Sequence, residues 1–169
     1  MMSDNGPNIV HVLSICRMPF KVHDQDIFIL CLLDKFTEKI KGGYIAINNL
    51  PAESLAEALM LIWNTCDANF GIGVPKRLLL DTCEIDGEKA KLLEKIFLDD
   101  GLQVEVGCLL NEDVTPEIQR AWQYVSIGVH SKLDELQNQG AKEFAFSAFM
   151  HWVSEEMNRY NERLGGNKD

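Results

Sequence analysis

The sequence predicts an α/β fold, in which a mostly parallel sheet of about four strands carries helices on both faces and is closed by a C-terminal αα-hairpin. Three observations support this prediction. Short segments rich in β-branched residues alternate with segments of helical periodicity. Leu78–Leu80 is a continuous apolar run, which is typical of a strand buried on both faces. Two long apolar stripes at helical spacing follow one another near the C-terminus.

Four segments are predicted to be strands. The first is rich in valine and isoleucine and is ended by Arg17, Met18 and Pro19, whereas the last alternates strictly between apolar and polar residues. The four segments are Ile9–Cys16, Tyr44–Asn48, Arg77–Asp81 and Leu102–Val106. Because a helix is predicted between each successive pair, right-handed crossovers should make these strands parallel.

The segment Asp24–Lys41 is predicted to be the first of these helices. Its apolar residues recur at helical spacing, and Gly42 and Gly43 would end the helix. The residues of this stripe are Ile29, Leu32, Leu33, Phe36 and Ile40. The run Ile27–Leu33 taken alone also fits a strand, but the periodicity that continues beyond it favours a helix.

Two further helices are predicted between the later strands. The first covers Pro51–Asp67, with proline in the first turn, where its missing N–H is tolerated. Its middle is apolar on nearly every side, which indicates burial on two faces. The second covers Gly87–Asp100 and is followed by Gly101, a residue typical of a helix C-terminus.

The C-terminal third is predicted to form the helical hairpin. Thr115 and Pro116 make a strong helix start, and the turn at 137–140 separates the two apolar stripes. We therefore predict a single domain over residues 9–164, with β-α repeats over 9–110 and the hairpin over 115–164 packed on them. Residues 1–8 and 165–169 are predicted to be flexible termini.

Composition limits the classes of function. The formal net charge is −10 and the pI is about 4.8, which argues against direct binding to nucleic acid or to an anionic membrane. The longest apolar run, Ile27–Leu33, is far too short to span a bilayer. Five cysteines without a C-x-x-C spacing, four of them in apolar stretches, indicate buried reduced thiols and a cytoplasmic protein.

The candidate site lies after the third predicted strand, because ligands of open parallel sheets bind beyond the carboxyl ends of the strands. Asp81, Glu84 and Asp86 are candidate metal ligands, since hard cations prefer carboxylate oxygens. Asp81 and Glu84, together with Arg17 and Cys83, are also the candidate catalytic residues. The alternative is that Asp81 or Asp86 caps the next helix.

The predicted hairpin carries many large side chains for two helices. Phe146 and Met150 are expected to point away from its main apolar stripe, and Trp152 lies beside them in the sequence. Exposed aromatic residues and methionines are enriched at protein interfaces. These three residues are therefore predicted to form an interface with a protein partner or with a second copy in a homodimer, and packing in the core is the alternative.

Two hypotheses of function follow from these features. The first is a small acidic interaction module, such as an adaptor, an inhibitor or an immunity-type protein, without catalysis and without a cofactor. The alternative is a metal-dependent phosphoester hydrolase that uses magnesium or manganese. Its carboxylate site would lie around Asp81 and Glu84, with Arg17 or Lys76 directed toward the substrate.

Overall fold

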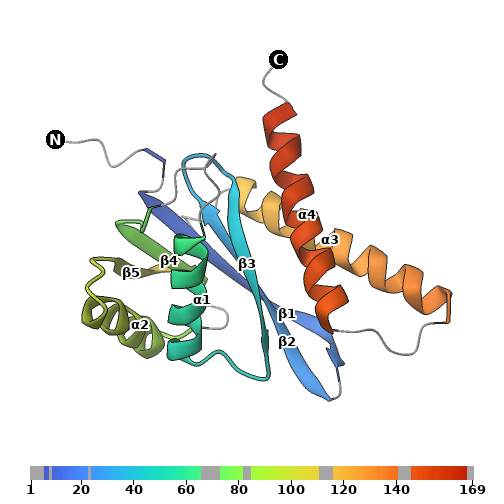
Figure 1. The fold of residues 1–169 in the computed structure, drawn as a ribbon, viewed down its shortest axis with the longest axis horizontal. Helices are drawn as coiled ribbons and strands as arrows, with labels where there is room; N and C mark the ends of the chain where they lie inside the picture. The colour runs from blue at the N-terminus through green and yellow to red at the C-terminus, as the bar shows by residue number, and fades with distance from the viewer. Residues whose placement is uncertain are drawn as a thin grey trace.

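The structure is a computed structural model, and it describes residues 6–7, 9–22, 24–65, 73–81, 85–110, 116–140 and 146–166. Three strands come first, and helices then alternate with two further strands before a pair of long helices ends the chain (Figure 1). The elements are β1 (Val10–Val22), β2 (Gln25–Asp34), β3 (Ile40–Ile47), α1 (Ala52–Asn64), β4 (Arg77–Asp81), α2 (Gly87–Asp99), β5 (Glu105–Leu109), α3 (Pro116–Asn138) and α4 (Phe146–Gly166).

The five strands form one sheet in the order β3-β2-β1-β4-β5. β2 pairs antiparallel with both β1 and β3, whereas β4 pairs parallel to β1, and β5 pairs parallel to β4. The predicted α/β class is therefore correct, but the predicted sheet is wrong. It contains five strands rather than four, and half of its pairings are antiparallel, so it is not mostly parallel.

The main cause of this difference is the segment predicted to be the helix Asp24–Lys41, which instead forms β2, a turn and the start of β3. β2 lies between β1 and β3, and alternate residues of the run Ile27–Leu33 pack into two different hydrophobic cores. A strand covered on both faces has no polar side to reveal its period of two. Phe36, which completed the helical stripe, lies exposed in the turn.

β1 also extends beyond the predicted stop at residues 17–19. The pairing of β1 with β2 shifts register between Arg17 and Lys21, and Pro19 falls within this irregular stretch. Proline cannot donate to a sheet hydrogen bond, and a bulge is one of the few places in a paired strand that accepts it. The strand continues past the proline to form a hairpin arm with β2 (Figure 1).

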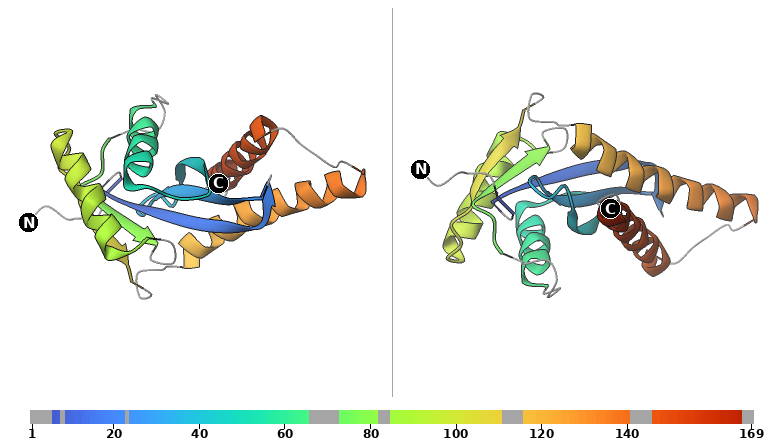
Figure 2. Two further views of the ribbon diagram at one scale, coloured as in Figure 1. Left: turned by 90° about the horizontal axis from the view of Figure 1, so that it is seen from below. Right: turned by 90° about the horizontal axis from the view of Figure 1, so that it is seen from above.

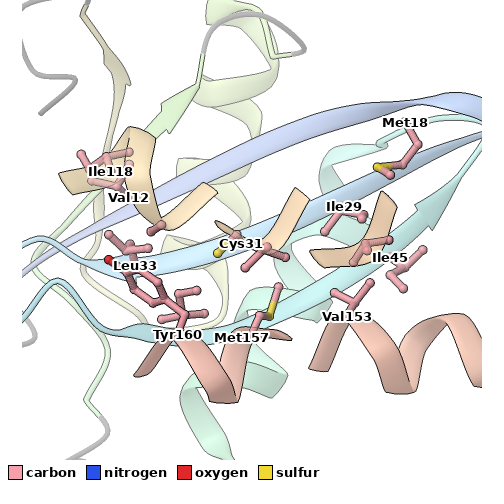
Figure 3. Packing of buried hydrophobic residues seen from close by; sticks show 14 of the residues in the cluster. Val12, Met18, Ile29, Cys31, Leu33, Ile45, Ile118, Val153, Met157 and Tyr160 are labelled. Atoms are coloured by element: carbon pink, nitrogen blue, oxygen red, sulfur yellow. The ribbon is translucent and has the colours of Figure 1, made fainter. Parts of the chain in front are cut away.

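Helices cover both faces of the sheet, as predicted, with α1 and α3 on opposite sides of β1 (Figure 2). One hydrophobic core lies between the sheet and α1 and α2, and the other lies between the sheet and α3 and α4. In the second core, side chains of α4 such as Met157 and Tyr160 face side chains of β2 such as Cys31 and Leu33 (Figure 3). None of the described helices is both long enough and apolar enough to cross a membrane.

The predicted αα-hairpin is confirmed, because α3 and α4 pack against each other as well as on the sheet. One polar side chain also fastens α4 to the backbone of β3. The side-chain amide of Asn161 donates from Nδ2 to the carbonyl oxygen of Ile40 at 2.7 Å, and its Oδ1 accepts from the Ile40 N–H at 2.8 Å. This two-point contact fixes the position of α4 along the start of β3.

Replacing Asn161 by alanine should therefore lower the free energy of unfolding by about 2 kcal/mol, since both partly buried backbone groups of Ile40 lose their partner. The measurement is urea unfolding of the variant beside Asn158→Ala, an exposed asparagine on the same helix. Equal stability of the two variants would show that the contact does not hold α4 in place.

Candidate functional site

The candidate site is the edge of the sheet where β4 ends. Asp81 is the last residue of β4 and pairs with Leu109 at the end of β5. On the other side, the parallel pairing of β4 with β1 runs as far as Leu80 opposite Leu13. The next residues along these two strands are Asp81 and Ser14, so a carboxylate and a hydroxyl occupy neighbouring strand positions. Ser14 is 8% exposed and is one of the few buried polar residues among those that the structure describes.

The first turn of α3 approaches the same region. Ile118 and Val12 belong to the same hydrophobic core, and they lie together in Figure 3. Val12 is two residues before Ser14 on β1, and Leu109, the strand partner of Asp81, belongs to this core as well. Glu117 is the second residue of α3, one position before Ile118.

The donor types at this edge fit a hard divalent cation. Ser14 on β1 offers a hydroxyl, and Asp81 on β4 and Glu117 on α3 offer carboxylates, which are the oxygen ligands that magnesium and manganese prefer. Among the side chains that the structure describes, no group of three or more His, Cys, Asp or Glu residues gathers into a metal site. The side chains of Asp81 and Glu117 lie outside that set, as does the whole segment 111–115.

The other predicted metal ligands divide into two cases. Glu84, with the candidate catalytic residue Cys83, falls outside the described residues, although both follow Asp81 directly in the chain. Asp86 is the N-cap of α2, and its Oδ1 accepts a hydrogen bond from the Lys89 N–H at 2.8 Å. The alternative predicted for this acidic stretch, a helix cap, is thus confirmed at Asp86.

Neither basic residue proposed to face the substrate is brought to Asp81. Arg17 lies three residues beyond Ser14 on β1, and its Nη2 is 2.5 Å from Oδ2 of Asp26 on the neighbouring strand. Lys76 precedes β4, at the end of the strand opposite to Asp81, and its N–H donates to the Ile9 carbonyl. Five residues of extended strand separate the two ends by roughly 16 Å.

The predicted interface residues differ in their surroundings. Met150 on α4 is 48% exposed, as expected for a side chain that points away from the core. Trp152 is only partly exposed and packs against the core between the sheet and the hairpin. The side chain of Phe146 lies outside the described set.

Comparison with known proteins relates this chain to others through its structure. No family model matches the sequence, and no curated protein matches it. Among solved structures, a chain of the simian T-cell lymphotropic virus intasome in complex with the PP2A regulatory subunit B56 gamma matches with a TM-score of 0.57 at 11% identity. The match covers 87% of this chain and 47% of that chain, so this protein spans about half the length of that relative.

Two integrase catalytic cores match over most of both chains. The HTLV-2 integrase catalytic core domain, in complex with magnesium, has a TM-score of 0.54 at 9% identity, with 87% of this chain and 83% of that chain covered. The catalytic core domain of BIV integrase has a TM-score of 0.54 at 10% identity, with coverages of 86% and 80%.

These neighbours contradict the prediction that the protein works without a cofactor, because the HTLV-2 core that shares its fold is a complex with magnesium. The oxygen donors at the end of β4 agree with this correction, since they are of the type that magnesium binds. At identities of 9–11%, the similarity establishes architecture alone. The chain therefore has the fold of an integrase catalytic core.

Proposed function

We propose that this protein carries out metal-dependent chemistry on a phosphate ester, at the edge of the sheet where β4 ends. The observation that carries this proposal is the position of Asp81. It ends a strand flanked by neighbours on both sides, and it stands beside the buried Ser14 in a fold that this chain shares with a magnesium-bound integrase core. Asp81 would be the central metal ligand.

The remaining ligands would come from the segments that adjoin Asp81. Glu84 is three residues further along the chain, and Glu117 begins α3. Ser14 adds a hydroxyl rather than a carboxylate from β1, so the chain supplies fewer negative charges to a metal from β1 than from β4 and α3. This composition favours a site that holds a single magnesium or manganese ion.

Charge supports a role for the ion in admitting the substrate. Residues 81–117 contain eleven acids and three lysines, which gives this region a net charge of −8. A phosphate ester would be repelled unless a cation offsets these carboxylates. Because Arg17 is paired with Asp26, the bound metal would supply positive charge that Arg17 does not bring to this edge.

The chain's own groups would position the reactants. The carboxylate of Asp81 would hold the ion at the end of a rigid strand, and α3 would close the edge from the side of its first turn. A bound magnesium or manganese ion supplies Lewis-acid polarisation of a phosphoryl oxygen and lowers the pKa of a bound water. The two cores on either face keep β4 fixed while substrate approaches the strand end.

The test is the effect of magnesium or manganese on the melting temperature. At a metal concentration about a hundred times the dissociation constant, binding should add about 2.7 kcal/mol to the free energy of unfolding, which raises the melting temperature by several degrees. Asp81→Asn should abolish this shift. Asp99→Asn, at the exposed end of α2, is the matched control and should keep it. An absent shift in the wild type, or an equal shift in both variants, would rule out a metal site at Asp81.

Self-association through α4 is the second candidate function, and the exposure of Met150 is the observation that favours it. Met150→Glu should convert a dimer into a monomer in light scattering, while Asn158→Glu, at an exposed position about two turns further along the same helix, should not. Trp152 is unsuitable for this test because its side chain also packs in the core. A wild-type protein that is monomeric at all concentrations would remove this candidate.

A further inference from the structure

A group of polar side chains lies buried at the end of the sheet away from Asp81. His11 on β1 is 1% exposed and is the strand partner of Asp34, which ends β2 and is fully buried. Lys41 on β3 places its Nζ 3.8 Å from Oδ2 of Asp34. From the α1 side, the indole Nε1 of Trp63 donates a hydrogen bond to Nδ1 of His11 at 3.2 Å.

This hydrogen bond determines which nitrogen of the neutral imidazole carries the proton. Trp63 can only donate, so Nδ1 of His11 must carry a lone pair, and the neutral ring carries its proton on Nε2. Nε2 is buried and has no hydrogen-bond partner among the residues that the structure describes. A second proton would have to bind at Nδ1, where it would face the indole N–H, so a charged His11 and the Trp63 hydrogen bond exclude each other.

We propose that His11 and Trp63 form a proton-sensitive latch that holds the end of α1 against β1 when His11 is neutral and releases it when His11 is charged. Trp63 is in the last turn of α1, and its ring packs on Phe97 of α2 with centroids 5.2 Å apart. Release of the indole therefore loosens the core under α1 and α2. On β4, the strand partner of His11 is Leu78, three residues before Asp81, so the latch lies on the same pair of strands as the candidate site.

The charged groups around His11 have opposite effects on its pKa. Asp34 on β2 favours the charged imidazole, whereas Lys41 on β3 disfavours it. The groups that face His11 from α1 and β4 are the uncharged side chains of Trp63 and Leu78. Burial outweighs the attraction of Asp34 and lowers the pKa of His11 from 6.5 to about 4.

Because the pKa of His11 is lower in the folded protein than in the unfolded chain, the stability of the fold should decrease as the pH falls. Below pH 6.5 the unfolded chain takes up a proton on His11 that the folded chain refuses until about pH 4, so acid favours unfolding through this residue. The contribution of a neutral His11 is complete above pH 6.5 and is lost as the pH falls toward 4. Between pH 7 and pH 5 the unfolding equilibrium constant should rise about 20-fold from this group alone.

Two measurements test the latch. The first compares urea unfolding at pH 7 and pH 5 for the wild type and for His11→Asn, whose side-chain oxygen can still accept from Trp63 but does not titrate. Between pH 7 and pH 5, the folding equilibrium constant of the wild type should fall about 20-fold more than that of the variant. His151→Asn, at an exposed position on α4, should behave as the wild type does.

The second measurement needs no variant of His11 and uses the indole N–H resonances of the wild type in ¹⁵N-labelled protein. The chain has three tryptophans, and Trp63→Phe identifies the relevant signal. This signal should shift between pH 5 and pH 4 in step with the imidazole resonances of His11. A His11 ring that titrates near 6.5, or a Trp63 signal that does not follow it, would overturn the proposal.

Discussion

Replacing Asp34 by alanine is expected to lower the free energy of unfolding by about 3–5 kcal/mol. Asp34 is fully buried, and its Oδ1 accepts a hydrogen bond from the Phe36 N–H at 3.0 Å. Its loss would leave the ammonium of Lys41, whose side chain is only 9% exposed, without this counter-charge. Desolvation already lowers the pKa of Lys41, and the carboxylate of Asp34 partly restores it.

Two further variants separate loss of charge from loss of packing. Lys41→Met in the Asp34→Ala background removes the stranded charge and should recover part of the lost stability. Asp26→Ala removes the partner of Arg17 at a more exposed ion pair and should cost at most about 1 kcal/mol. The measurement is urea unfolding at pH 7. An Asp34→Ala variant as stable as Asp26→Ala would contradict a buried ion pair.

Gly43→Ala is expected to cost about 3 kcal/mol, because α4 and β2 leave no space for a Cβ at this position of β3. A Cβ built there would overlap Cε of Met157, and it would lie 2.6 Å from the Met157 Sδ and 2.9 Å from the Leu30 carbonyl oxygen. The methionine can turn aside, but the carbonyl belongs to the neighbouring strand. The sheet itself would therefore have to move.

Gly107→Ala is the matched control, since it lies in β5 and its Cβ would meet only Leu79 Cδ2, at the ordinary contact distance of 3.4 Å. Comparing the urea midpoints of the two variants isolates the close approach at Gly43 from the general cost of altering a strand glycine. Equal urea midpoints for Gly43→Ala and Gly107→Ala would contradict the close contact of α4 and β2 with Gly43.

The sequence predicted an element most reliably where the segment has one solvent-exposed face or a recognisable capping residue. The hairpin helices were found because their apolar residues recur on one stripe, and α2 was found with the aspartate that caps it. The run Leu78–Leu80 was correctly predicted to be an inner strand of the sheet, since five residues are too few for a buried helix.

Patterns failed where burial is complete. The run Ile27–Leu33 is apolar throughout, as expected both for a strand covered on two faces and for a buried helix. Phe36 and Ile40 happen to continue its apolar residues at helical spacing. Its true period becomes visible only when the neighbouring strands and both cores are known. Because this segment was predicted to be a helix, the antiparallel pairing of β1, β2 and β3 was not predicted. The similarity to the fold of integrase cores was therefore not recognised from the sequence.

The candidate site was predicted in part. The rule that ligands bind at strand ends selected Asp81, and Ser14 became a candidate only when the pairing of β1 with β4 placed it beside this position. The start of α3 was not included, because Thr115 and Pro116 were interpreted only as a helix start. The partners of Arg17 and the distant position of Lys76 depend on strand pairing, which residue spacing does not reveal.

Anomalous scattering from a crystal soaked in manganese would show directly whether Asp81 binds a metal. One manganese peak is expected at the end of β4, bound by the carboxylate of Asp81 and by at least one acid from the segments that follow β4 or β5. A saturated crystal with no peak beside Asp81, or with manganese bound only elsewhere on the surface, would contradict metal binding by Asp81.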